Sequence, residues 1–246
     1  MQAVVLITGG SRGIGAATAV AAAQAGYAVA VNYKANALAA DEVVRQIRAR
    51  GGTAITVRAD VAVEEQVLTM FTKVDAKLGT LSALVNNAGV VDRASRVDAM
   101  DVARLKRMFD TNVLGSIVCA REAVLRMSTR HGGAGGAIAN VSGVADGRGR
   151  AVCGLRRHQG AIDTFTLGLA KEVAQEGIRV NAVCPDIIDT DIHASGGQPE
   201  RARLMAAQVP MQRPGTAAEV ARAIVWLMGD GASYTTGTLL NVAGGR

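Results

Sequence analysis

Short apolar runs alternate with helical patterns along the whole chain. The runs are rich in β-branched residues and apolar on both faces, which is typical of strands buried beneath helices on both sides of a sheet. Apolar residues recur at helical spacing over Glu64–Leu78 and Gly160–Gln175, and a further helix is predicted over Ala16–Ala25. This alternation predicts an α/β fold, with a single doubly wound parallel sheet and helices on both faces. The predicted strands are Ala3–Thr8, Ala28–Asn32, Ala54–Val57, Leu81–Asn86, Ala137–Val141 and Ile178–Val183.

One irregular stretch stands out within an otherwise regular chain. Asp186–Gly215 carries Pro199, Pro210 and Pro214 together with a pair of glycines, and it predicts a partly helical excursion. Loops at the carboxyl ends of α/β strands are where ligands bind. We find no linker, repeat or low-complexity tract, so we expect one dinucleotide-binding domain over residues 1–246, with its substrate loop at about 186–215.

Composition excludes several classes of protein. With 49% hydrophobic and 20% charged residues in 246, the chain is ordinary for a globular protein that needs no disulfide or metal staple. Its three cysteines are widely spaced, which fits neither a disulfide framework nor a metal site, so we expect no metal and a reducing, cytoplasmic location. The sequence shows no signal peptide and no apolar run long enough to span a bilayer, so we expect no membrane partner.

A glycine-rich turn follows the first predicted strand and opens the first predicted helix. Glycines permit a tight turn and a close backbone approach to a pyrophosphate, and the helix N-terminus offers free N–H groups and a positive dipole end to that anion. The strand–turn–helix context favours a dinucleotide site over a simple turn. The candidate contacts in this turn are Gly9, Ser11, Arg12, Gly13, Ile14 and Gly15.

The end of the second predicted strand bears on the choice of cofactor. NAD sites usually place an acid there for the ribose 2′-hydroxyl, whereas this chain has Asn32, Tyr33 and Lys34. Lys34 and Arg12 would attract a 2′-phosphate, which favours NADP(H) over NAD(H). The alternative is that both are solvated surface cations.

Further motifs then occur in the order that the short-chain dehydrogenase/reductase family has them. The chain resembles its glucose-1-dehydrogenase-like and 3-oxoacyl carrier-protein reductase-like branch over essentially its whole length, including the segments 178–183 and 240–245. The resemblance implies a Rossmann-type sheet. It assigns adenine contacts to Asp60 and Val61, and a proton-relay water to Asn112. Further cofactor contacts implied by the resemblance are Asn87, Ala88, Gly89, Pro185, Ile188 and Thr190.

The resemblance also implies a reaction. Family members transfer a hydride between the nicotinamide and a small carbonyl or alcohol substrate, with a Tyr as general acid/base. A Lys four residues later, on the same helix face, lowers the ordinary tyrosine pKa of about 10, and a Ser binds the substrate oxygen. The family usually assembles as tetramers or dimers, so we expect a homo-oligomer, a homotetramer or a dimer.

The chain departs from the family where this chemistry is expected. The Tyr position is Leu155 and the Lys position is Gln159, and neither residue can do the same work. Spacing selects Ser142 as the catalytic serine, whereas the usual Asn-Val-Ser-Ser motif places it at Gly143. Asp186 stands where a Gly is expected, and its carboxylate would disfavour cofactor binding. The sequence therefore predicts an impaired NADP(H)-dependent oxidoreductase.

Three alternatives stay open. The chain could be a non-catalytic NADP(H)-binding protein, or a frameshifted form of an active reductase. Codons compatible with residues 153–160, read one base later, give Ala-Ala-Tyr-Ala-Ala-Thr-Lys, which restores the missing pair in register. The third is a nucleic-acid binder, suggested by the net charge of +6 alone. However, +3 of that charge lies within Val144–Gln159, and the chain lacks a recognition motif, so we expect no nucleic-acid partner.

Overall fold

The computed structural model describes residues 2–93, 95–143 and 153–246, with the backbone alone for residues 153–158 and 193. Within these residues, seven strands form one parallel sheet in the order β3-β2-β1-β4-β5-β6-β9. The predicted doubly wound Rossmann-type sheet is therefore confirmed. The strands are β1 (Val4–Ile7), β2 (Ala28–Tyr33), β3 (Ala54–Arg58), β4 (Leu81–Asn86), β5 (Gly136–Val141), β6 (Ile178–Pro185) and β9 (Leu239–Val242).

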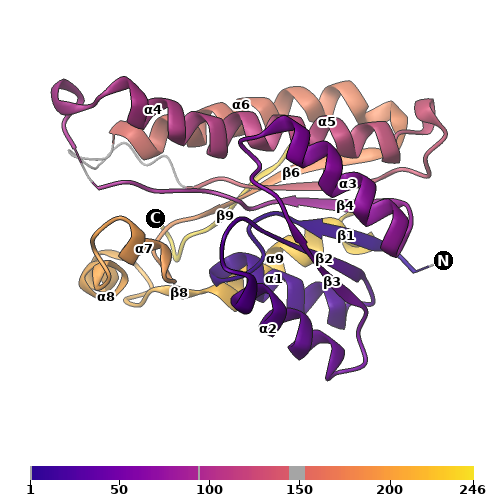
Figure 1. Cartoon of the computed structure of the whole chain (residues 1–246). Coiled ribbons are helices and arrows are strands. Elements are labelled where there is room, and N and C mark those ends of the chain that lie inside the picture. Colours follow the sequence, from indigo (N-terminus) through magenta and orange to yellow (C-terminus); the bar gives the residue numbers. More distant parts are fainter. Residues whose placement is uncertain (1, 94, 144–152) are drawn as a thin grey trace.

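Helices cover both faces of this sheet, so the molecule has three layers (Figure 1). One layer holds α3 (Glu64–Leu78), α4 (Val102–Phe109), α5 (Gly115–Met127) and α6 (Cys153–Val173). The opposite layer holds α1 (Gly13–Gln24), α2 (Ala37–Arg48) and α9 (Ala217–Met228).

Alternation along the strands creates two hydrophobic cores. In β1, Val4 and Leu6 pack toward the α3, α5 and α6 layer, whereas Val5 and Ile7 pack toward α1, α2 and α9. Because both faces are covered, these strand residues are almost fully buried, as the continuous apolar runs predict. Phe71 is the largest side chain in the first core.

The strand order reverses between β1 and β4, and the carboxyl edge at this point is where α/β sheets bind ligands. Residues 186–215, which we call the substrate loop after their expected role, project from the same edge as a partly helical excursion (Figure 1). It contains β7 (Ile188–Asp189), α7 (Ile192–Ser195), α8 (Arg201–Met205) and the start of β8 (Gly215–Thr216). No helix in the described ranges is long and apolar enough to cross a membrane.

Candidate functional site

The glycine turn forms a bare backbone surface at the start of α1. Gly9 and Gly13 adopt left-handed φ angles of +62° and +54°, which side chains other than glycine rarely tolerate. A Cβ on Gly15 would overlap the carbonyl oxygen of Gly9 and lie 2.5 Å from Asn87 Nδ2, so only glycine lets the helix approach this closely. These three glycines hold the backbone in the shape that the sequence predicts.

The N-terminus of α1 suits an anion. Arg12 is the N-cap, its side chain makes no capping hydrogen bond, and the first turn of the helix has no acidic residue. The first N–H groups and the positive end of the helix dipole are therefore not satisfied by an Asp or Ser cap, as they are in many helices. The residues present fit a dinucleotide pyrophosphate.

Thr8 and Asn87 fasten this turn to the end of β4. The buried Thr8 hydroxyl accepts hydrogen bonds from the backbone N–H groups of Asn87 and Ala88, each at 3.0 Å. Asn87 Nδ2 donates in return to the carbonyl oxygens of Thr8, at 2.9 Å, and Gly9, at 3.1 Å. The two motifs, more than 70 residues apart in sequence, thus form one side of the site.

The three candidate residues at the end of β2 differ in burial. The buried Asn32 accepts from Gly9 N at 3.1 Å and donates to the carbonyl oxygens of Val57 and Ala59, so its side chain ties three strand ends together. Tyr33 is half-buried beside the second core. Lys34 is largely exposed and pairs with Asp60 across 2.6 Å.

Asp60, the partner of Lys34, and Val61 follow β3. Asp60 accepts from the backbone N–H of Ala62 at 3.1 Å, and its side chain is 18% exposed. Val61 is buried in the first core, against the position of Gly115. The carboxylate of Asp60 therefore holds the ammonium of Lys34 beside the ends of β2 and β3.

Asn112 lies within a short π-helical turn, Asp110–Leu114, between α4 and α5. Its side-chain amide pairs with both backbone groups of Val90, donating to the carbonyl at 2.9 Å and accepting from the N–H at 2.8 Å. A Cβ on Gly89 would lie 3.7 Å from Asn112 Oδ1, so this residue holds the segment that follows β4. π-Turns of this kind occur frequently at functional sites.

A buried polar chain crosses from β4 to α6. Asn86 donates to Asn140 Oδ1 at 3.0 Å, and Asn140 donates to Thr166 Oγ1 at 2.8 Å. All three side chains are at most 3% exposed. These hydrogen bonds fix the relative positions of β4, β5 and the middle of α6, although Asn86 Oδ1 itself is buried without a hydrogen-bond partner among the described residues.

Ser142 follows β5 and directs its hydroxyl toward α6. The single hydrogen of its hydroxyl faces two acceptors, the carbonyl oxygen of Gln159 at 3.4 Å from Oγ and the carboxylate of Asp163. Burial raises the pKa of Asp163, and it raises the pKa of the neighbouring Cys184 thiol to about 11, so this thiol stays protonated at neutral pH.

Gln159 occupies space beside Gly143. A Cβ built on Gly143 would overlap the Gln159 side-chain amide, and Gln159 Oε1 is buried without a hydrogen-bond partner among the described residues. Leu155 lies in the first turns of α6, where the structure gives the backbone alone. Most of the departing segment, residues 144–152, lies outside the described residues.

Pro185, Ile188 and Thr190 come from the end of β6 and the segment after it. Ile188 is buried and pairs with Gly215 between β7 and β8. A Cβ on Gly13 would lie 3.5 Å from the Thr190 side chain, so Thr190 faces the glycine turn across the site. Pro185 ends β6 beside Val242 of β9.

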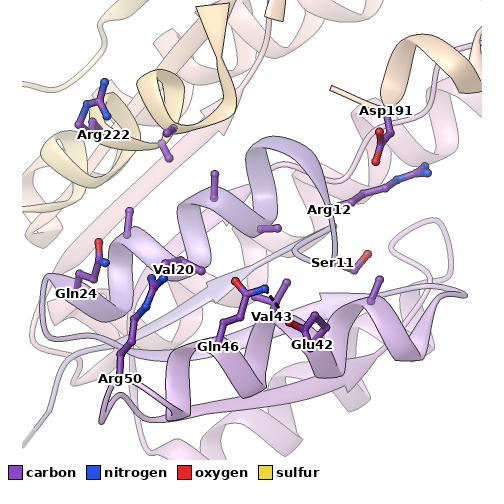
Figure 2. A pocket seen from close by; sticks show the side chains of 16 residues that line it. Ser11, Arg12, Val20, Gln24, Glu42, Val43, Gln46, Arg50, Asp191 and Arg222 are labelled. Carbon is purple, nitrogen blue, oxygen red and sulfur yellow. Dashed lines mark hydrogen bonds between the residues drawn. The ribbon is translucent and has the colours of Figure 1, made fainter. Parts of the chain in front are cut away.

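A separate groove of about 670 Å³ lies on the outer side of α1, between α2 and α9 (Figure 2). Ser11, Arg12 and Asp191 stand at one end of it, and Gln24 and Arg50 at the other. The groove meets the glycine turn only through Ser11 and Arg12, so it is distinct from the edge where the predicted residues meet. In the described part of the chain, no group of His, Cys, Asp or Glu side chains could hold a metal ion.

Comparison with known proteins agrees with this geometry. The family profile described as enoyl-(acyl carrier protein) reductase matches residues 9–246. The chain is 50% identical over 247 residues to an uncharacterized oxidoreductase, YgfF, of Escherichia coli, with 100% of both chains covered. It is 34% identical over 240 residues to a 3-oxoacyl-[acyl-carrier-protein] reductase of Staphylococcus aureus, covering 98% of this chain and 96% of that one.

A solved structure adds the fold. The crystal structure of a gluconate 5-dehydrogenase from Burkholderia cenocepacia, in complex with NADP and tartrate, superposes with a TM-score of 0.89 at 27% identity, covering 99% of this chain and 94% of that one. The chain belongs to the short-chain dehydrogenase/reductase family. Its relatives include 3-oxoacyl-[acyl-carrier-protein] reductases and a glucose dehydrogenase.

Within this short-chain dehydrogenase/reductase, the structure adds residues that the sequence did not single out. Thr8 ends the first predicted strand, but its role depends on a contact with residues 87 and 88 that no local pattern reveals. Arg246, the last residue, forms an ion pair with Asp186 at 3.0 Å, and nothing in the sequence relates these two positions. The side chain of Asn32, expected as a cofactor contact, is buried and supports the glycine turn through its hydrogen bond from Gly9 N.

Proposed function

We propose that this chain binds NADP(H) at the carboxyl edge of its sheet and that its hydride-transfer activity on a small carbonyl or alcohol substrate is impaired. The observation that carries the first half is the glycine turn, with an N-cap that makes no side-chain hydrogen bond, at the N-terminus of α1. The observation that carries the second is the pair Leu155 and Gln159 at the family's Tyr and Lys positions.

Each part of the site is assigned to a part of the cofactor. The backbone from Gly9 to Gly15 would hold the pyrophosphate, Asp60 and Val61 the adenine, and Thr190 with Pro185 and Ile188 the nicotinamide end. Arg12 and Lys34 would attract a 2′-phosphate. β2 itself ends without a carboxylate, and the acid beside Lys34 is Asp60, which follows β3. When bound, the nicotinamide supplies or accepts the hydride, and the chain must supply the proton.

The residues at the family's Tyr and Lys positions cannot carry out the proton transfer in this chain. A positioned general acid contributes about 10²- to 10⁴-fold in rate, and leucine has no proton to give. Gln159 carries no charge that could lower the pKa of a tyrosine. Ser142, the serine selected by spacing, is engaged by Gln159 and Asp163, whereas Gly143 offers no hydroxyl.

The cofactor half is tested by titrating the protein with NADPH and NADH and following the fluorescence of the nicotinamide. We expect saturable binding of both, with NADPH the tighter ligand. Lys34→Gln is expected to reduce the difference between the NADPH and NADH affinities, because it removes a cation that would attract the 2′-phosphate. Lys77→Gln, at an exposed position of α3, is the matched control. Equal affinity for the two cofactors in the wild type would refute the preference.

A second proposal concerns the origin of the departing segment. We infer that residues 144–159 arose by a frameshift in the gene or in its read, since a one-base shift restores Tyr and Lys in register. The Escherichia coli oxidoreductase aligns over the full length of both chains at 50% identity, so the segment 144–159 occupies the place of a family segment of matching length. Resequencing codons 140–162 tests this. Codons that cannot give Tyr and Lys in the shifted frame exclude it.

A further inference from the structure

The last three residues of the chain touch both ends of the substrate loop. Arg246 Nε lies 3.0 Å from Asp186 Oδ2, at the start of the loop. Near the other end of the loop, Met211 N donates to the carbonyl oxygen of Gly244 at 3.1 Å, and Gly245 packs against Pro210. The C-terminal segment therefore joins two parts of the loop that are about two dozen residues apart.

Gly244 and Gly245 allow this approach. They have φ angles of +62° and +95°, in the left-handed region that favours glycine. A Cβ on Gly244 would lie 2.6 Å from Val209 Cγ1, and one on Gly245 would lie 3.0 Å from Pro210 Cβ. The backbone turn that these glycines make carries Arg246 to the end of β6.

The ion pair is sheltered from water. The side chains of Arg246 and Asp186 are 14% and 17% exposed, far less than those of Arg203 and Glu200, which pair on the surface of α8 at 80% and 61% exposure. Coulomb attraction is stronger in such a sheltered place, so removing the Arg246 cation is expected to cost more than removing a cation from a surface pair.

Asp186 also stands at a sensitive place. It follows Pro185 at the carboxyl end of β6, on the edge of the sheet to which we assign the anionic cofactor. A negative charge here would repel that cofactor. Arg246 supplies the opposite charge at 3.0 Å, so its guanidinium offsets the charge of the Asp186 side chain.

We infer that Arg246 is a positioning residue that neutralises Asp186 and thereby lets the carboxyl edge of β6 accept the dinucleotide. This inference rests on the proposed binding of NADP(H). It assigns a role to the C-terminal residue and accounts for an aspartate where the family has glycine. The test compares Arg246→Gln, Arg246→Lys, Asp186→Asn and the double variant Asp186→Asn/Arg246→Gln.

NADPH dissociation constants, measured by nicotinamide fluorescence, are the main readout. We expect Arg246→Gln to weaken NADPH binding about tenfold or more, and Arg246→Lys to keep affinity close to wild type because it keeps the charge. Asp186→Asn alone should bind at least as well as wild type. Adding Asp186→Asn to Arg246→Gln should restore affinity, because the carboxylate that repels the anionic cofactor is gone. Arg203→Gln is the matched control and should change nothing.

The thermal melting temperature of each variant, without cofactor, is the second readout. We expect Arg246→Gln to melt below wild type and the double variant to regain part of that loss. If wild type binds NADPH and Arg246→Gln binds it equally well, the inference is wrong while the proposed function stands. The inference is also wrong if Asp186→Asn fails to restore the affinity of Arg246→Gln. If no variant, wild type included, binds NADPH, the proposed function itself fails and the inference fails with it.

Discussion

Replacing Thr8 with valine tests whether one hydroxyl holds the two halves of the cofactor site together. Valine has nearly the same shape, so the change removes hydrogen bonds and leaves no cavity. The Thr8 side chain is 2% exposed and accepts from Asn87 N and Ala88 N, each at 3.0 Å. It also donates to the carbonyl oxygen of Val85 at 3.3 Å.

The structure shows which of these groups would lose its partner. Asn87 N also donates to Val85 O at 3.1 Å, and Val85 O also accepts from Thr8 N at 3.0 Å, so both keep a hydrogen bond. Ala88 N alone depends on the hydroxyl among the bonds described. Leaving one sheltered N–H without an acceptor costs about 1–3 kcal/mol. We therefore expect Thr8→Val to lower the free energy of unfolding by about 2 kcal/mol, which corresponds to a melting temperature about 4–8 °C lower.

Chemical denaturation monitored by circular dichroism measures this loss. Thr69→Val is the matched control, because the exposed Thr69 hydroxyl only donates back to Glu65 O within α3, and its loss should stay within about 0.5 kcal/mol. We also expect weaker NADPH binding for Thr8→Val, since residues 87–88 form one side of the site. A Thr8→Val protein as stable as Thr69→Val would refute the reasoning.

Three further predictions follow from particular contacts. Gly15→Ala should destabilise the protein by about 2 kcal/mol or more and abolish NADPH binding, because its Cβ would overlap Gly9 O. Gly168→Ala, in an open position of α6, should raise the melting temperature instead. Burial raises the pKa of Asp163 in the native state, so the unfolded chain loses this proton at lower pH than the native state does. The ionised carboxyl therefore lowers the free energy of unfolding at neutral pH. Asp163→Asn should therefore have a higher melting temperature than wild type at neutral pH, and this difference in melting temperature should vanish near pH 3. An equal difference at both pH values would contradict this. Light scattering should give a mass that is two or four times 25.3 kDa, and Leu125→Lys, which charges a half-exposed position on α5, should lower it. A monomeric wild type would overturn the expected assembly.

The sequence predicts most of the sheet, because strands buried on both faces need continuous apolar residues. The bounds of β4 and α3 agree with the predicted Leu81–Asn86 and Glu64–Leu78 to the residue. By contrast, β9 was matched to the family but not predicted as a strand. It lies at the sheet edge, where Leu239 and Asn241 are exposed, so its pattern lacks the run that marks the other strands.

The candidate site was predictable where chemistry is local and not where it depends on long-range contacts. The glycine turn was found from its own residues, and its left-handed glycines have the shape that the motif requires. Neither the inward direction of Asn32 nor the pairing of Asp186 with Arg246 has a local signature, because each partner lies far away in sequence. The start of α6 at Cys153, ahead of the predicted Gly160, falls in the segment that departs from the family.

Turnover at saturating NADPH tests the central claim most directly. The comparison is between wild type and Gly143→Ser/Leu155→Tyr/Gln159→Lys, with Leu167→Tyr on the exposed side of α6 as the control. A Cβ at position 143 would overlap the end of the Gln159 side chain, so the serine and the residue 159 substitution are made together. On a panel of small ketones and aldehydes, the restored variant is expected to turn over about 10²- to 10⁴-fold faster than wild type and the control. Wild-type turnover equal to that of the restored variant, at about 10 per second or more, would contradict the claim that this chain is impaired.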